Sequence, residues 1–359
     1  MKLLMSFGGI IHQMRKSANV EDGQGKRKKS TIREIAELAG VSATTVSRTL
    51  NDPSLVDPAT ARRVLDAVQS KGYYPNTHAR SLVSGKSRMI GLIVSDITNP
   101  FFPEIVQGFE EAAMAKGYDI LIGSTGYDLG RMTNCVRRML ERKVEGVVIM
   151  TSEMDAHLVD QFSHREVRMV FLDVGRPGPG ISNILVDYSM GIGEAADHLY
   201  ELGHRRIGFV SGPSQLKSAQ IRRSAFLSSL RHYELSEDLV VEGDHRVAGG
   251  LGAMNRLLSL PDPPTAVLSS NDLTAVGAMR AMRKARLRVP EDISIVGFDD
   301  IGLAEFTDPP LTTVRLPRRQ IAECAFEAVV SDMNAPGWKN EYAIETHLVI
   351  RESTCRPSR

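Results

Sequence analysis

The sequence predicts a small all-α N-terminal domain, followed by a larger α/β body with doubly wound parallel sheets in two lobes. Two observations predict these classes. Capped helical segments follow one another from residue 31 to residue 72, and apolar, strand-like runs alternate with helical segments from residue 89 onward. The length points to several units, because 359 residues exceed one small domain and roughly 265 residues of alternating elements exceed one such sheet.

The composition is that of an ordinary globular protein, with 42% hydrophobic and 24% charged residues. It excludes a mostly disordered chain, a collagen-like chain and a membrane bundle. The apolar run at 3–11 is too short to span a bilayer, and no small-residue cleavage site follows it, so we expect no export and no membrane partner. Cys135, Cys324 and Cys355 show no pairing rhythm, which favours a reducing, cytoplasmic location.

Charge is distributed unevenly along the chain. Residues 1–85 hold 13 Lys and Arg against 7 Asp and Glu, and by difference from the totals of 44 and 43 the remainder holds 31 against 36. The basic N-terminal quarter predicts a polyanionic partner at one end, although a solubilising tail would have the same charge. Residues 1–29 are expected to be a disordered extension, whose basic run 26–29 either contacts phosphates or is simply solvated.

Three helices are predicted between residues 30 and 74. Thr31 to Glu34 form a capping box, and Gly40 ends the first helix. Ser42 caps a second helix over 43–50, and Asp57-Pro58 opens a third that Gly72 closes. We expect an inward-facing set made of Val46, Leu50, Ala61, Val64, Leu65 and Val68. Two short helices joined at a glycine turn and braced by a third make a helix-turn-helix domain.

The second helix has the outer face that a DNA reader needs. With Val46 buried, the small residues Ala43, Thr44 and Thr45 lie outside and allow close approach to a major groove. Arg48 can bind guanine O6 and N7 with two hydrogen bonds. The alternative is a three-helix bundle whose outer face has no function.

The stretches TIREIA at 31–36, AGVS at 39–42 and TVSR at 45–48, with Asn51 after them, resemble the headpiece of the lactose-repressor (LacI/GalR) family. The stretches GYYPN at 72–76 and ARSL at 79–82 continue the resemblance. It implies a homodimer or dimer of dimers that reads a pseudo-palindromic double-stranded operator. The implied DNA-binding residues are Thr31, Ala43, Thr44, Thr45, Arg48, Asn51 and Leu82.

Residues 75–87 link the headpiece to the body. Two helical turns at 76–84 are marginal in isolation, because nucleating a helix is unfavourable. The resemblance implies a hinge helix that orders on the operator and inserts Leu82 into the minor groove as a wedge. A plain interdomain linker is the alternative.

The body is expected at 88–352, with a tail at 353–359. The first lobe is expected to comprise about 88–187 plus 317–338, and the second about 188–314 plus 340–352. The predicted strands are Ile90–Val94, Ile120–Ile122, Val147–Met150, Met169–Leu172, Ile207–Val210, Ala266–Leu268 and Ile293–Val296. The predicted helices lie near 101–116, 129–142, 188–202, 217–233, 246–259 and 272–287.

Polar and aromatic residues cluster just after these strands, where open α/β sheets bind ligands. Carboxylates, an amide, a guanidinium and a phenyl ring together suit a sugar. The resemblance extends to about residue 351, where the body is similar to periplasmic sugar-binding proteins. The implied effector-binding residues are Asn99, Phe101, Phe102, Asp173, Arg222, His245, Asn271 and Asp299.

Two positions depart from the sugar-binding pattern. Leu316 stands where a glutamine is frequent, and His245 stands where an aromatic stacking residue is frequent. Arg222 together with His245 points to an acidic sugar or a sugar phosphate as well as to a neutral sugar.

The sequence shows no catalytic constellation, metal-ligand spacing or cofactor motif, so we expect neither an enzyme nor a bound cofactor. We expect a DNA-binding transcription regulator, in its commoner mode a repressor, whose operator affinity a small ligand between the lobes controls allosterically. The alternatives are a sugar-binding transport receptor and a carbohydrate-acting enzyme.

Overall fold

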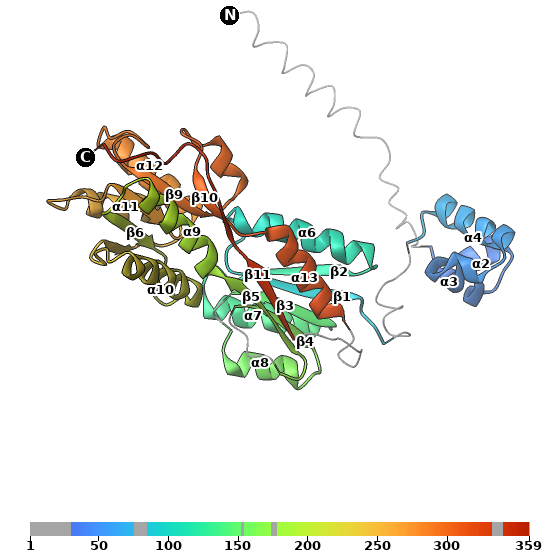
Figure 1. The fold of residues 1–359 in the computed structure, drawn as a ribbon. Helices are drawn as coiled ribbons and strands as arrows, with labels where there is room; N and C mark the ends of the chain where they lie inside the picture. Colours follow the sequence, from blue (N-terminus) through green and yellow to red (C-terminus); the bar gives the residue numbers. More distant parts are fainter. Residues whose placement is uncertain (1–29, 75–84, 152–153, 174–177, 332–339, 359) are drawn as a thin grey trace, which may run out of the picture. The chain divides into compact units, whose positions relative to one another are not determined.

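The computed structural model describes residues 30–74, 85–151, 154–173, 178–331 and 340–358 and divides after Gly85 into two compact units (Figure 1). The predicted N-terminal extension, and most of the predicted hinge with Leu82, lie outside the described residues. No described helix is long and apolar enough to cross a bilayer.

The N-terminal unit has the three predicted helices, α2 (Ile32–Ala39), α3 (Ala43–Asn51) and α4 (Pro58–Lys71), with a 3-10 turn η1 (Pro53–Leu55). Their predicted caps are confirmed: the Thr31 side chain accepts from the Glu34 amide, Ser42 from Thr45 and Asp57 from Thr60. Gly40 has a left-handed φ of 65°, which suits glycine.

Ile35, Val46 and Val64 are fully buried in the small core of this unit. The expected inward position of Leu65 is wrong, since that side chain is 44% exposed. The buried stripe of α4 runs through Ala61, Val64 and Ala67, and Leu65 lies one position around the helix from it.

The first sheet of the body has the order β11-β5-β4-β3-β1-β2, and its strand pairs are parallel. Helices α6 (Phe101–Ala115) and α13 (Arg318–Val330) pack on one face, and α7 (Leu129–Glu141) and α8 (Ala156–Ser163) on the other. The strands are β1 (Met89–Val94), β2 (Asp119–Ser124), β3 (Gly146–Met150), β4 (Arg168–Leu172), β5 (Ile181–Asp187) and β11 (Glu341–Glu345).

The second sheet has the order β12-β10-β9-β8-β6-β7 and is parallel except for the antiparallel pair of β10 and β12. Helices α9 (Tyr188–Glu201) and α10 (Lys217–His232) cover one face, and α11 (Val247–Leu258) and α12 (Asp272–Lys284) the other. The strands are β6 (Ile207–Ser211), β7 (Val240–Glu242), β8 (Ala266–Ser269), β9 (Ser294–Asp299), β10 (Thr312–Arg315) and β12 (His347–Val349), and a 3-10 turn η2 spans Gly302–Phe306.

The chain crosses between the sheets three times: from β5 to α9, from β10 to α13, and from β11 to β12 (Figure 1). The assignment of 340–352 to the second lobe is therefore wrong in its first half, because Glu341–Glu345 pairs with β5 of the first sheet. The expectation that 353–359 is a tail is also wrong at its start, because Ser353 packs into the second sheet. Ser353 is fully buried and bonds to the Thr312 amide and the Ile295 carbonyl, contacts made by single polar groups and not by an apolar pattern.

Candidate functional site

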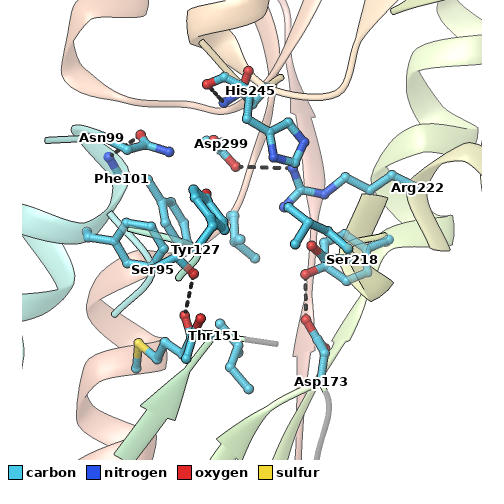
Figure 2. A pocket seen from close by; sticks show the side chains of 17 residues that line it. Ser95, Asn99, Phe101, Tyr127, Thr151, Asp173, Ser218, Arg222, His245 and Asp299 are labelled. Atoms are coloured by element: carbon cyan, nitrogen blue, oxygen red, sulfur yellow. Dashed lines mark hydrogen bonds and ion pairs between the residues drawn. The ribbon is translucent and has the colours of Figure 1, made fainter. Parts of the chain in front are cut away.

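The carboxyl ends of strands from both sheets border one cavity in the body (Figure 2). The space between the lining atoms is about 690 Å³ when the solvent at its open mouth is included. The structure brings together here all eight residues predicted to bind an effector. They are Asn99, Phe101, Phe102, Asp173, Arg222, His245, Asn271 and Asp299.

On the first-sheet side, the start of α6 supplies the aromatic wall. Asn99 Oδ1 accepts from the Phe101 amide at 3.1 Å and so fixes the turn into the helix. The Phe101 and Phe102 rings meet edge to face, with centroids 5.1 Å apart. These two rings offer an apolar surface on which a sugar ring can pack.

Asp173 follows β4, and its side chain is hydrogen-bonded to β5 of its own sheet and to the start of α9, where the chain crosses to the second sheet. Its carboxylate accepts from the Val186 amide at 2.8 Å and from the Tyr188 hydroxyl at 2.5 Å. Burial raises the pKa of Asp173 above its usual value, although these hydrogen bonds act in the opposite direction.

Arg222, on α10, provides the cationic group of the second-sheet side. Its Nη1 lies 3.7 Å from Asp299 Oδ1 and donates to the Ser270 carbonyl at 2.5 Å. The guanidinium carbon lies 4.3 Å from the centre of the Phe298 ring. Burial raises the pKa of Asp299 to about 6, and the charges of Arg222 and Arg318 only partly offset that rise.

His245 and Asn271 line the second-sheet side of the cavity and are hydrogen-bonded to each other. The Asn271 side chain donates to the His245 carbonyl at 3.1 Å and caps α12 through the Thr274 amide at 2.9 Å. The imidazole packs against Gly212, where an added Cβ would lie 1.9 Å from Nε2. Burial lowers the pKa of His245 to about 3, so the ring is neutral at physiological pH.

Three buried polar atoms in this cavity have no partner among the described residues: Thr151 Oγ1, Arg222 Nε and His245 Nε2. Asp173, His245 and Asp299 also have left-handed φ values of 64°, 60° and 105°. Such strain costs about 1–3 kcal/mol per residue, and it concentrates at functional sites. Unpartnered polar groups and strain both indicate a cavity shaped for a polar ligand.

Sequence reasoning missed other lining residues, including Ser95, Tyr127, Thr151, Tyr188, Leu216 and Ser218. Ser95 and Thr151 directly follow buried strands, so the rule that identified Asp173 also applies to them. Tyr188 begins α9 at a chain crossing, and no local pattern marks it. Within the described part of the chain, no cluster of three or more His, Cys, Asp or Glu could hold a metal ion.

The predicted DNA-binding residues lie in the N-terminal unit. Thr44, Arg48 and Asn51 are exposed on α3, while Ala43 and Thr45 are half-buried. Thr45 Oγ1 lies 2.9 Å from Ser42 Oγ in the helix cap, so its hydroxyl is already engaged. Thr31 is exposed at the start of α2, and Leu82 lies outside the described residues.

Comparison with known families matches both units. Residues 31–76 match the family described as bacterial regulatory proteins, lacI family. Residues 196–354 match the periplasmic binding protein-like domain.

Curated relatives align over nearly the whole chain. The HTH-type transcriptional repressor PurR of Photobacterium profundum is 33% identical, covering 90% of this chain and 98% of its own. The HTH-type transcriptional repressor CytR of Escherichia coli is 34% identical over 90% and 96%, respectively. The probable HTH-type transcriptional repressor ExuR of Bacillus subtilis is 35% identical over 91% and 98%.

Solved structures agree. A lac repressor dimer bound to operator and the anti-inducer ONPF superposes with a TM-score of 0.82 at 29% identity, covering 91% of this chain and 100% of that one. A complex of the transcriptional regulator CelR with cellobiose gives a TM-score of 0.67 at 29% identity over 90% and 99%. The chain therefore belongs to the lacI family of bacterial regulatory proteins.

Proposed function

We propose that this lacI-family regulator is a cytoplasmic repressor that binds operator DNA through α3 and a sugar or sugar derivative in the cavity of the body. One observation carries the effector half: the eight residues that the family resemblance implied, scattered along the sequence of the body, line a single polar and aromatic cavity. Family membership favours a regulator over a transport receptor or a carbohydrate-acting enzyme.

The DNA half rests on the exposed face of α3. Arg48→Ala should weaken operator binding roughly 5- to 150-fold, which corresponds to 1–3 kcal/mol for one bidentate guanine contact. Arg62→Ala, at an exposed arginine on α4, is the matched control. Gel-shift titration on genomic fragments measures both, and equal operator affinity and sequence preference of Arg48→Ala and wild type would refute the groove assignment.

The hinge proposal concerns Leu82, which we expect to act as a minor-groove wedge. Leu82→Ala should weaken specific binding more than non-specific binding, because the wedge acts only where the duplex kinks. Equal losses on operator and random DNA would remove this proposal.

The charges that line the cavity favour a neutral sugar over a sugar acid or sugar phosphate. Above pH 6 the Asp299 carboxylate faces the cavity with Arg222, the one cationic side chain among the described lining residues, and His245 is neutral. Asp173 adds a second carboxyl group to the lining and no further cation. A thermal-shift screen with D-ribose, cellobiose, D-glucuronate and glucose 6-phosphate tests this, because a specific ligand raises the melting temperature. A larger rise in melting temperature with D-glucuronate and glucose 6-phosphate than with the two neutral sugars would contradict the preference for a neutral sugar.

Self-association is proposed through exposed apolar side chains of the body. Phe306 is 82% exposed on η2 and Met114 is 69% exposed at the end of α6, with Leu303 and Ile122 also exposed. Leu303 and Phe306 lie together on η2, and contiguous exposed apolar patches mark protein interfaces. Phe306→Ser should lower the oligomeric mass measured by light scattering, and an unchanged mass would exclude η2 from the interface.

A further inference from the structure

Arg318 uses every nitrogen of its guanidinium at the junction of the two sheets. It is the first residue of α13, just after the chain has crossed from β10. Its Nε donates to Glu104 Oε2 at 2.7 Å, its Nη2 to the Asp300 carbonyl at 2.7 Å, and its Nη1 to the Asp299 carbonyl. Its side chain is only 12% exposed.

These partners belong to opposite walls of the cavity. Asp299 ends β9 and lines the second-sheet wall. Glu104 lies in the first turn of α6, and the first two residues of that helix, Phe101 and Phe102, line the first-sheet wall. Arg318 therefore connects the backbone of one wall to the helix of the other.

Helix packing holds Glu104 within reach. An added Cβ at Gly108 of α6 would lie 3.1 Å from the Ala322 Cβ of α13, so the two helices approach closely at this point. Glu104 precedes Gly108 by four residues, and Arg318 precedes Ala322 by four, so both side chains lie one turn before the close approach. The pair is thus set by the fold and is not a chance surface contact.

The other end of the connection is a strained turn held by further arginines. Asp299 and Asp300 both have left-handed φ values, 105° and 54°. The Asp300 carboxylate accepts from Arg315 Nε and Arg351 Nη2, each at 2.7 Å. With its carboxylate and carbonyl held by arginines, the turn has little freedom to reorient Asp299.

We propose that Arg318 is a positioning residue for effector binding: it fixes the Asp299-Asp300 turn against α6 and so sets the separation of the two cavity walls. This role rests on the proposed effector function of the cavity. Movement of either wall is transmitted through Arg318 to the other, which makes the residue a point of coupling between the cavity and the first lobe.

The proposal requires a guanidinium. Three donors in a planar fork reach a carboxylate and two carbonyls that lie in different directions, whereas a lysine ammonium is a point charge without that fork. Arg318→Lys should therefore keep much of the thermal stability and still fail to hold the turn.

The first experiment needs no ligand. Hydrogen–deuterium exchange of the full-length protein compares wild type with Arg318→Met, Arg318→Lys and Glu104→Gln. Arg319→Met is the matched control, because Arg319 is the next residue, is 80% exposed and pairs only with Glu323 among the ion pairs described. We expect faster exchange in peptides covering 299–306 and in the first turn of α6 for the Arg318 variants, and wild-type exchange for Arg319→Met.

The second experiment measures binding of cellobiose and D-ribose by calorimetry. Arg318→Met should weaken binding of whichever sugar binds the wild type by about tenfold or more, as expected for the loss of charge-assisted hydrogen bonds. Glu104→Gln should weaken it less, with an unchanged melting temperature.

Exchange at 299–306 in Arg318→Met that matches Arg319→Met would overturn the positioning role. So would wild-type exchange and sugar affinity in Glu104→Gln, a variant that keeps the readout available if Arg318→Met does not fold. If neither sugar binds wild type while the exchange result holds, the effector assignment fails and the structural connection stands.

Discussion

The helix caps of the headpiece are made by neighbours in sequence, whereas the cavity of the body joins residues from Ser95 to Leu316. Each α-helix of the headpiece starts at a side-chain cap three residues before the amide from which it accepts. In the body, a single guanidinium contacts groups contributed by several strands and helices. The difference implies that one substitution in the cavity disturbs many elements, while one at a helix cap of the headpiece disturbs a single helix.

The largest effect is expected at Arg222. Arg222→Met leaves the buried carboxylates of Asp299 and Asp173 without their shared cation, and breaking a buried pair in this way costs about 3–5 kcal/mol. Urea unfolding followed by circular dichroism measures the loss. Arg223→Met, at the exposed neighbour on the same helix, should change little, and equal losses in the two variants would contradict the structure of the cavity.

The next effect is a pH dependence with two opposed sources. The pKa of Asp299 is about 6 in the folded protein and 3.8 normally. Its favourable contribution to the free energy of unfolding is therefore complete below pH 3.8 and is lost as the pH rises to 6. The pKa of His245 is about 3 against 6.5, so stability is lost as the pH falls through that range. Between pH 3.8 and 6 the two largely cancel.

Removing either ionisable group should reveal the pH dependence of stability that the other one causes. As the pH falls from 6 toward 3.8, Asp299→Asn should lose, and His245→Phe gain, up to about 1.4 kcal/mol per pH unit relative to wild type. Burial raises the pKa values of Asp173 and Asp272 as well, and both residues remain in each variant. Chemical unfolding at several pH values measures the slopes, and parallel slopes in the two variants would show that neither group is buried as described.

A smaller, local effect is expected at Thr31. Thr31→Ala removes the capping-box hydrogen bond that the Thr31 hydroxyl accepts from the Glu34 amide, and it should cost the headpiece about 1 kcal/mol. Hydrogen exchange separates the two units: protection should fall in α2 and stay unchanged in the sheets. Thr44→Ala, at an exposed position inside α3, is the control. Loss of protection in the body would mean that the units do not respond separately.

The smallest effect is expected at an ion pair that lies beside the cavity residues Asn99 and His245. Arg246 Nη2 lies 3.4 Å from Asp96 Oδ2, and the two residues come from opposite lobes. Arg246 is 62% exposed, so the pair should contribute at most about 1 kcal/mol. Arg246→Gln should weaken cellobiose or D-ribose binding less than fivefold, and more at low than at high salt. The exposed Arg283→Gln serves as control, and a salt-independent change would argue against this pair.

Many locally determined elements could be predicted from the sequence, although helices α8 and α13 and strand β5 were not. The caps at Thr31, Ser42 and Asp57 and the strands that precede Asp173 and Asp299 were all predictable, because caps and buried parallel strands leave short-range patterns. The predicted roles of the cavity residues and of α3 in binding remain predictions. Family membership, by contrast, is established by the comparisons over nearly the whole chain.

What could not be predicted depends on long-range pairing. Glu341–Glu345 and His347–Val349 are adjacent in sequence, yet they join different sheets. Only the structure shows that the chain leaves the first sheet after Glu345 and enters the second at His347. Tyr188 reaches Asp173 because the chain crosses there, and Ser353 is buried through single hydrogen bonds to other strands. None of these contacts leaves a periodic signal.

The last of the three crossings has a consequence for biosynthesis. Both sheets receive a strand from residues 341–349, after all their other strands have been made. A nascent chain that has emerged from the ribosome only as far as β10 has open strand edges at β5 and β10, each able to pair with another chain. The body can complete its assembly only after residues 341–349 have emerged, and a truncation before them would leave both halves unfinished at once.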